Sequence, residues 1–548
     1  MPDSGTDVVF NLSASKAEVS VTTELPPVSS LFVTGAGASF NLESAAKMRV
    51  SGAVTNFSST AYQGGSYAFG DEMVIGYTKG WNGNSQSSQT CAQFTNAKAD
   101  VAGRVFVTGY SGNGLDVGEG AFLTCAGYLD SLGTRNVSRV HDGGVLHSTA
   151  DIVIADAWPN AANPESFVVD SGTVTNEGAL KIAYNNAGGV PVNLRNGAEW
   201  VQKGNTLVGC SNQGNVLNVL SASKFLSSAA ILISATGRTS QNAVVVDGES
   251  TLKSEEVWVG GFDGVSESSL TVLNDSAASV ERLYLGGKNA NMRMSLVVAE
   301  NATLHAANLS VGGELSSSDE LGIAITNAVL TVENAVAFPV DTTSGAVSFS
   351  IKGASASPAV ANFPGGLIIG AGKKSSKGDV IRRKPTLVHV EDAVIVAGTS
   401  DAEGASTSGD VRIGALNVGG AFDVATNRLE IAGRDGCFIV NHRMMAAGNA
   451  EICFRVPEGG YAGTYGCGLY GKNFYITDAK IIVDVSKVET DGTYLLAKAT
   501  NALNLDAANL TLVTHDKQRA KLEYQNTAEG RYLAVTVKRR YGFAIILR

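Results

Sequence analysis

The sequence predicts an all-β protein, a right-handed parallel β-helix (a β-solenoid) with about 26 residues per turn. Three observations predict it: apolar segments that recur at a fixed interval, turn-forming residues at matching places between them, and a composition dominated by small and β-branched residues. Of the 548 residues 63 are glycine, whereas only 17% are charged and 7% aromatic. Small residues suit sharp corners and β-branched residues suit strands.

The repeat is sharpest between residues 231 and 340. The first apolar strand of each repeat recurs every 26 residues, at Ile231, Val257, Leu283, Leu309 and Ala335. A second strand follows 13 residues later, at Val244, Leu270, Leu296 and Gly322. A third lies about eight residues beyond the second, and four repeats keep this register without an insertion.

The strands alternate apolar and polar residues, which sends one face inward. Since the chain returns after 26 residues, equivalent strands should stack in parallel and form three sheets around one apolar core. Glycine pairs after the first strand should form one corner: Gly260-Gly261, Gly286-Gly287 and Gly312-Gly313. Asn and Asp, which tolerate a left-handed backbone, should form another corner at Asp275, Asn301 and Asn327, with Glu249 at the aligned position of the first repeat.

The chain should divide at about residue 460. We expect residues 1–460 to form the solenoid and residues 461–548 to form the final turns and a C-terminal cap, because tyrosines become frequent and strands lengthen there. A cap is expected since a solenoid leaves an open sheet edge that invites aggregation.

The charge disfavours some partners. A net charge of −10 and a pI near 5.3 argue against nucleic acid or an anionic membrane surface as a partner. No run of 18 apolar residues predicts a transmembrane helix. The first residues lack the basic and apolar regions of a signal peptide, so a fragment or a mature form is expected.

Two stretches resemble a known family. Residues 296–318, LVVAENATLHAANLSVGGELSSS, are similar to the repeats of bacterial autotransporter passengers and autotransporter-associated β-strand repeat proteins, and GTYLLAKATNALNLDAANLTLV (492–513) followed by YLAVTVK resembles their closing segment. The resemblance implies an exported or surface-displayed β-helix with an adhesive or structural role. No transporter barrel follows Val537, so the export route stays open; the tail KRRYGFAIILR could be a last capping strand or a sorting or anchoring signal.

Catalytic signals are weak, although β-helices do carry polysaccharide lyases and hydrolases. The aligned positions Asp247, Leu273, Ala299 and Ile325 carry a single acid. Arg139, His141 and Asp142 form the one local group with a cation, a base and an acid, and His147 could share its face. Residues 111–117 half-match a calcium-binding repeat but occur once. We therefore predict no catalytic, cofactor-binding or metal-binding residues.

Aromatic residues offer one candidate binding site. Trp258 lies between two apolar residues of an alternating strand and should face outward, where Tyr284 of the next repeat also points. An exposed aromatic pair of this kind could bind surface glycans.

Cysteines are few and scattered, which fits an exported protein without a disulfide framework. Cys437, Cys453 and Cys467 are close enough in sequence for one disulfide, and the sequence leaves that open.

These observations together predict a non-enzymatic, secreted or surface-displayed bacterial solenoid that acts as an adhesin or a structural element. The alternative is a carbohydrate-active β-helix enzyme or a glycan-binding protein, with its site in the less regular region of about residues 60–160. Carboxylates clustered on one sheet face would favour the enzyme.

Overall fold

The computed structural model describes most of the chain. The described residues are 5–11, 16–24, 26–34, 39–44, 47–76, 90–108, 112–130, 136–154, 165–183, 188–210, 213–234, 241–260, 267–286, 293–312, 320–340, 345–354, 359–371, 384–399, 409–414, 425–446, 448–515, 518–527 and 530–539. The protein is all-β, with 67% strand and 1% helix, and forms a parallel β-solenoid of about 26 residues per turn. The predicted fold class and period are confirmed, and the right-handed winding stays a prediction.

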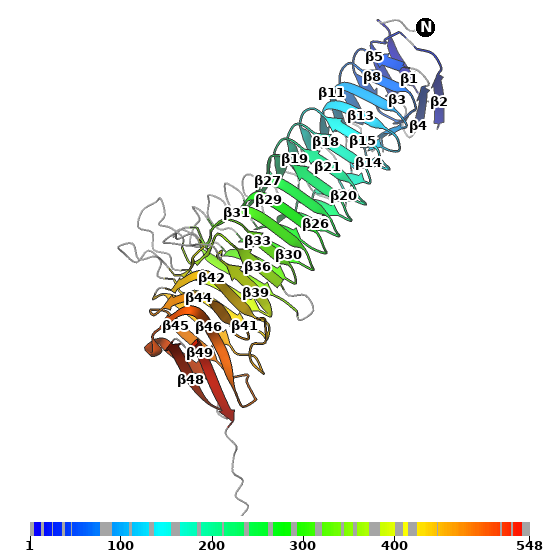
Figure 1. Cartoon of the computed structure of the whole chain (residues 1–548). Coiled ribbons are helices and arrows are strands. Elements are labelled where there is room, and N and C mark those ends of the chain that lie inside the picture. Colours follow the sequence, from blue (N-terminus) through cyan, green and yellow to red (C-terminus); the bar gives the residue numbers. More distant parts are fainter. Residues whose placement is uncertain are drawn as a thin grey trace, which may run out of the picture. The chain divides into compact units, whose positions relative to one another are not determined.

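The chain divides into two compact units, and each is a stack of parallel strands (Figure 1). Unit 1 comprises residues 1–271 and 275–279, and unit 2 comprises residues 272–274 and 280–548. The strands β28 (Glu267–Val272) and β29 (Ala277–Leu285) contain the points of division. In each unit the other strands belong to two hydrogen-bonded sheets, called sheet A and sheet B below. The expected boundary at residue 460 stays a prediction.

In unit 1 each turn adds one strand to sheet B and two short strands, or one long strand, to sheet A. The sheet B strands are β2 (Lys16–Val21), β4 (Ser39–Ser44), β7 (Ser59–Gln63), β10 (Cys91–Thr95), β12 (Gly114–Val117), β14 (Ser138–His141), β17 (Phe167–Asp170), β20 (Pro191–Arg195), β23 (Val216–Leu220) and β26 (Asn242–Asp247). The sheet A strands include β11 (Lys98–Thr108), β13 (Phe122–Asp130), β15 (Val145–Ser148), β18 (Thr173–Asn176), β24 (Lys224–Ser227), β25 (Ala230–Ile233) and β27 (Thr251–Val259).

Unit 2 repeats this arrangement. Its sheet B strands are β30 (Arg293–Ala299), β32 (Glu320–Thr326), β35 (Ala346–Lys352), β38 (Thr386–Glu391), β41 (Asn427–Ala432), β43 (Ala450–Arg455), β45 (Lys480–Asp484) and β47 (Leu510–Val513). Its sheet A strands include β31 (Thr303–Val311), β33 (Val329–Val332), β40 (Val411–Ile413), β42 (Cys437–Ala446), β44 (Leu469–Ile476), β46 (Gly492–Leu505), β48 (Gln518–Thr527) and β49 (Gly530–Arg539).

The prediction of three separate sheets is wrong in one respect. The third strand of one repeat and the first strand of the next belong to the same sheet, because they join into one long strand in several turns. For example, β24 and β25 are separate strands, and both pair with the single nine-residue strand β27. The inward alternation of β27 breaks at Glu255 and Glu256, although the strand continues through both residues.

The 26-residue period is confirmed in sheet A, where Ile231 pairs with Val257 and Leu304 pairs with Leu330. In sheet B of unit 2 the predicted register is wrong by one residue. Leu296 lies opposite Ile323, and Ala299 lies opposite Thr326 rather than Ile325.

The cause of this shift is a change in two connections. The segment between β31 and β32, residues 312–319, is one residue longer than residues 286–292 one turn earlier. The corner after β32 is one residue shorter, since Glu300 and Asn301 both have a positive φ after β30, whereas only Asn327 does after β32. The two changes cancel, so that sheet A keeps its period.

The predicted corner residues have the expected backbone. Gly260, Gly286 and Gly312 have φ angles of 117°, 119° and 77°, which side chains rarely allow. The second glycine of each pair lies outside the described residues. The four residues predicted for the other corner also have positive φ: Glu249, Asp275, Asn301 and Asn327.

The core of each unit is a stack of inward-facing apolar side chains. In unit 1 aromatic rings continue from turn to turn: Trp200 packs between Phe167 and Phe225, with ring centroids 5.6 and 6.1 Å apart. Trp200 is fully buried, and its indole N–H donates to Gln202 Oε1 at 3.0 Å. Such burial of polar groups is tolerated because the hydrogen bond satisfies them.

Parallel stacking in unit 2 gives way to antiparallel pairing near its last described strands. Strand β49 pairs antiparallel with β46, and β48 pairs antiparallel with β49. Sheet A therefore ends in a hairpin, whereas sheet B ends at β47, which pairs in parallel with β45. The function of this region as a cap stays a prediction.

Candidate functional site

The aromatic residues predicted to bind a ligand lie in different units. Trp258 in β27 of unit 1 is half-buried, and its indole N–H donates to the Glu256 carboxylate. Tyr284 in β29 belongs to unit 2 and is half-buried as well. Because the two side chains belong to different units, each is described separately. A glycan-binding face that includes both of them stays a prediction. Trp81 and Trp158 lie outside the described residues.

A cluster of charged residues lies on sheet B of unit 1, around the predicted group of Arg139, His141 and Asp142. His141 bridges two carboxylates: Nε2 lies 2.7 Å from Asp116 Oδ1 on β12, and Nδ1 lies 2.8 Å from Asp142 Oδ2. The parallel register explains the approach, since Asp116 lies opposite Arg139 on the neighbouring turn. Stacking has brought together residues that are 25 positions apart.

The next turns extend this cluster with a second set of ion pairs. Arg195 on β20 donates from Nη1 to Glu165 Oε1 at 2.8 Å and from Nε to Asp170 Oδ2 at 2.7 Å. Arg139 lies 3.5 Å from the other oxygen of Glu165. Four carboxylates therefore lie on adjacent turns of one sheet, and each is engaged by a cation or by His141. We call the whole set the His141 cluster: Asp116, Arg139, His141, Asp142, Glu165, Asp170 and Arg195.

The electrostatics of the His141 cluster favour charged side chains. Partial burial lowers the pKa of His141, but hydrogen bonds to Asp142 and Asp116 outweigh it, so the net pKa is raised. Partial burial raises the pKa of Asp170, but hydrogen bonds from Asn196 and Arg195 hold it below its usual value. His141 therefore keeps its proton to a higher pH than a free imidazole does, and Asp170 keeps its charge to a lower pH than a free carboxylate does.

His147 does not join this cluster, contrary to the expectation of a shared face. It lies on β15 in sheet A, whereas His141 lies on β14 in sheet B. His147 Nε2 is 3.3 Å from Glu177 Oε1 instead. The corner between the two strands, which includes Gly143 with a φ of 77°, separates the two imidazoles onto different sheets.

The half-matched calcium motif has a structural use. Asp116, its acidic residue, holds His141, and Gly114 allows close approach of the next turn, because an added Cβ would lie 2.0 Å from the carbonyl oxygen of Val137. Within the described ranges no group of three or more His, Cys, Asp or Glu residues is placed to hold a metal ion. Ser111 lies outside those ranges.

A second charged network lies on sheet B of unit 2 and was not predicted. Its centre is Glu430 on β41, whose side chain is only 8% exposed. Three cationic or imidazole groups reach its carboxylate: His389 Nδ1 at 3.0 Å, Arg455 Nε at 2.8 Å and Arg428 Nη2 at 2.8 Å. These residues come from three successive strands, β38, β41 and β43, that pair in parallel.

The network continues to both sides of Glu430. His389 also approaches Glu391, which pairs with Lys352 at 2.7 Å, and Glu451 lies 3.4 Å from Lys480. We call the whole set the Glu430 network: Lys352, His389, Glu391, Arg428, Glu430, Glu451, Arg455 and Lys480. The hydrogen bond from His389 is the largest cause that lowers the pKa of Glu430 to about 2, with the charges of Arg455 and Arg428 adding to it against the effect of burial.

A third buried carboxylate lies at Asp410, directly before β40. Its side chain is 2% exposed, and Arg443 of β42 reaches both of its oxygens, with Nη2 to Oδ2 at 2.6 Å and Nε to Oδ1 at 3.2 Å. His442 Nδ1 lies 2.9 Å from Oδ1. This bidentate pairing fixes a connection of the solenoid to the following turn.

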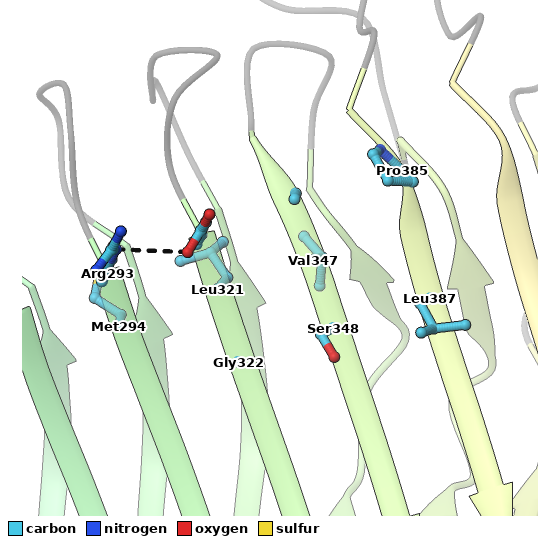
Figure 2. Close-up of a pocket in the computed structure, with 10 residues that line it drawn as sticks. Arg293, Met294, Leu321, Gly322, Val347, Ser348, Pro385 and Leu387 are labelled. Atoms are coloured by element: carbon cyan, nitrogen blue, oxygen red, sulfur yellow. Dashed lines mark ion pairs between the residues drawn. The ribbon is translucent and has the colours of Figure 1, made fainter.

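A recess of about 430 Å³ lies on the outer face of sheet B in unit 2, at the beginning of β30, β32, β35 and β38 (Figure 2). Gly322 and Ser348 lie side by side in the parallel register, and the exposed Leu387 follows on the next strand. Gly322 leaves space, since an added Cβ would meet only the carbonyl oxygen of Met294 at 3.8 Å. Arg293 and Glu320 form an ion pair of 3.5 Å that also lines the recess. Most of the residues that line the recess are apolar or glycine, and Arg293, Glu320 and Ser348 are the polar ones.

The cysteines are all free thiols, including the three for which a disulfide was left open. Cys437, Cys453 and Cys467 are buried in unit 2. Burial raises the pKa of Cys437 and of Cys467 to about 12, so both are poor nucleophiles. They act as small core residues here.

Comparisons with known proteins name no relative. The sequence matches no protein-family model, and no curated protein matches it. The resemblance to autotransporter passengers therefore stays a prediction, and the β-solenoid fold is what the structure supports. Of the described residues, none forms a helix that is long and apolar enough to cross a membrane.

Proposed function

We propose that this protein is a non-enzymatic β-solenoid, secreted or displayed at a bacterial cell surface, which acts as an adhesive or structural element. One observation carries the proposal: the carboxylates that stacking gathers on the sheet faces are neutralised by cations from neighbouring turns. Glu430 and Asp410 are both buried; two arginines and a histidine hold Glu430, and an arginine and a histidine hold Asp410. Such carboxylates stabilise a stack of turns instead of exchanging protons with a substrate.

The low charge density supports the same reading. Only 17% of residues are charged, and the charged side chains of the His141 cluster and the Glu430 network pair across turns. The recess beside Gly322 and Ser348 lies on the outer face of sheet B, with Leu387 as its exposed apolar wall. Surfaces of this kind bind partners through shape and modest apolar contact.

The proposal is tested by separating binding from turnover. The purified chain is incubated with a panel of bacterial and host polysaccharides, and new reducing ends and unsaturated sugars are measured alongside binding to the same glycans. We expect no products. Products that form with the unaltered chain and disappear in Asp116→Asn or Glu430→Gln would overturn the proposal, provided that both variants keep the circular dichroism spectrum of the parent.

Binding to glycans has its own test. Surface glycans are among the proposed partners, and the half-buried Trp258 is the aromatic residue expected to contact them. Glycan binding should fall in Trp258→Ala and stay unchanged in Trp258→Phe if an aromatic ring is what the sugar contacts. Equal binding by all three proteins would remove Trp258 from the site.

The carbohydrate-active alternative is favoured by one specific observation. The His141 cluster places four carboxylates and an imidazole on adjacent turns of unit 1, and it overlaps the region of residues 60–160 where an enzyme site was considered. If it were a catalytic site, His141→Ala would abolish product formation without loss of binding.

A further inference from the structure

Two tyrosines stack against each other on the surface of unit 2. The ring centroids of Tyr465 and Tyr470 are 3.7 Å apart, and the angle between the ring planes is 6°. Tyr465 is 37% exposed and Tyr470 is half-buried, so Tyr465 is the outer ring of the pair. Among the residues that the structure describes, neither hydroxyl has a hydrogen-bond partner. The pair therefore offers a ring face and two hydroxyls to a ligand.

A tight turn places Tyr465 over β44. The Gly466 N–H donates to the Gly463 carbonyl at 2.8 Å, and Gly466 has a φ of 61°. The same segment is anchored to the core by Tyr461, which is 6% exposed and donates from its hydroxyl to the Ile431 carbonyl at 3.0 Å. Because the outer ring is already held in place, its ordering adds little to the entropic cost of binding.

Tyr470 belongs to a row of outward side chains that crosses sheet A. Residues that lie opposite each other in register share a face of the sheet, and Tyr470 on β44 lies opposite Lys498 on β46, which lies opposite Tyr532 on β49. Since neighbouring strands are about 4.8 Å apart, the two tyrosines flank Lys498 at about 10 Å from each other. The Tyr532 hydroxyl donates to Glu523 at 3.2 Å, which holds this ring as well.

The aromatic character of the row begins at Tyr470. On the preceding turns of unit 2 the same row consists of Thr331 on β33, Asn362 on β36 (Ala359–Phe363), Val396 on β39 (Ala393–Ala397) and Ile439 on β42. These turns stack without a ring at this position. The tyrosines are therefore not a requirement of the parallel stack.

Lys498 brings a positive charge between the rings. It is exposed, and within the described part of the chain its ammonium group forms no ion pair. Residues 469–539 contain ten Lys or Arg and eight Asp or Glu, a balance of +2, whereas the whole chain has a net charge of −10. The region around Lys498 is thus more favourable to an anion than the overall charge indicates.

We propose that these four residues bind an acidic glycan, and we call them the tyrosine row: Tyr465, Tyr470, Lys498 and Tyr532. The apolar face of a sugar ring packs on the exposed face of Tyr465, and the carboxylate of a uronic acid pairs with Lys498. The tyrosine hydroxyls supply hydrogen bonds to the hydroxyls of the sugar. The inference rests on the proposed adhesive function and deepens it, because it names the class of glycan and a site in unit 2.

Isothermal titration calorimetry of the full chain tests the charge. The probes are short oligomers of galacturonic, glucuronic and mannuronic acid, each compared with its neutral methyl ester. We expect at least one acidic oligomer to bind, and its ester to bind about tenfold more weakly. Lys498→Gln should weaken binding of the acid about tenfold and leave binding of the ester unchanged. No binding of any acidic oligomer, or equal binding of acid and ester, would overturn the proposal.

The rings are tested with the same probes. Tyr465→Ala should weaken binding of acid and ester alike by about tenfold, whereas Tyr465→Phe keeps the ring and should retain most of the affinity. Tyr475→Ala is the matched control, since Tyr475 is a 42% exposed tyrosine of the same strand β44 that lies outside the row, and should bind as the parent does. Each variant must keep the unfolding midpoint of the parent. Unchanged binding by Tyr465→Ala, or equally weakened binding by Tyr475→Ala, would overturn the assignment.

Two further outcomes separate this site from the proposed function. Glycan binding that depends on Trp258 but not on Lys498 would overturn the tyrosine row and leave the adhesive function intact. Cleavage of the oligomers would overturn the non-enzymatic function, and with it the assignment of the row to binding alone. Single-stranded DNA also combines flat rings with negative charge, and binding of oligothymidylate more tightly than of every uronate would overturn the glycan as the ligand.

Discussion

The His141 cluster of unit 1 and the Glu430 network of unit 2 are built on the same principle and differ in burial. In both, parallel stacking brings an imidazole to a carboxylate of a neighbouring turn, and a carboxylate of its own turn contacts it as well. Asp116 and Asp142 are 21% and 70% exposed on their side chains, whereas Glu430 is 8% exposed. Water therefore competes with His141 for hydrogen bonds to Asp116 and Asp142, whereas it hardly reaches Glu430.

This difference in burial indicates what determines how much an ion pair contributes to the stability of a solenoid. The distances are similar, 2.7 Å for His141 to Asp116 and 3.0 Å for His389 to Glu430, so geometry does not distinguish the two. Removal of a buried partner leaves other charges unpaired, whereas exposed charges are rehydrated.

The largest effect is expected at Asp410, the most buried of the carboxylates discussed above. Asp410→Asn removes the charge that Arg443 and His442 share, and should lower the free energy of unfolding of unit 2 by about 3 kcal/mol. The measurement is chemical denaturation followed by circular dichroism. Asp142→Asn is the exposed control and should change it by less than about 0.5 kcal/mol. Equal effects would break the comparison.

Glu430→Gln should cost somewhat less, about 2 kcal/mol, because Arg455 is half-exposed and can be rehydrated while His389 and Arg428 lose their partner. Glu451→Gln on the neighbouring strand serves as the control, since Glu451 is more exposed and meets its partners at 3.4 and 3.9 Å. The denaturation midpoint should move much more for Glu430→Gln than for Glu451→Gln. A larger shift for Glu451→Gln would contradict it.

The pH dependence of stability should follow His389. The hydrogen bond to Glu430 raises the pKa of His389 above its ordinary value of 6.5. Protonated His389 therefore stabilises the fold fully below about pH 6.5, and this contribution is lost as the pH rises through the raised pKa. The difference in unfolding free energy between the parent and His389→Gln should shrink as the pH rises above about 6.5 and through the raised pKa of His389. A difference that is independent of pH would exclude this role.

The smallest effect is expected at Asp116. Asp116→Asn should lower the pKa of His141 toward its ordinary value, because one of its two carboxylate partners is lost, while stability changes by less than about 1 kcal/mol. Titration of the His141 ring protons by NMR gives the pKa directly. An unchanged pKa would mean that Asp142 alone raises it.

The fold could be predicted because its signal is local and repeated. The glycines after the first strand and the left-handed residues at the other corner recur in sequence, and each has the backbone that its position demands, as Gly260 and Asn301 illustrate. The division into three sheets was wrong because alternation alone does not reveal that a strand such as β27 continues through a break in its alternation.

The charged networks could not be predicted from the period. His389 and Glu430 are 41 positions apart, and Asp410 and His442 are 32 apart, because connections of different length interrupt the repeat in this part of unit 2. A fixed 26-residue alignment places none of these pairs together. The sequence indicates the group around His141 because His141 and Asp142 are adjacent. It does not indicate Asp116, the partner of His141 on the preceding turn.

The compensating connections around β32 bear on how such a chain can change over time. An added residue before the strand is cancelled by one fewer at the following corner, so the disturbance ends within a single coil. An insertion in one connection therefore need not shift the pairing of later strands when the following corner is shortened by the same number of residues. Loops on this scaffold are free to vary in length independently of each other, and variation of that kind can diversify what the surface presents while the stack beneath it is inherited intact.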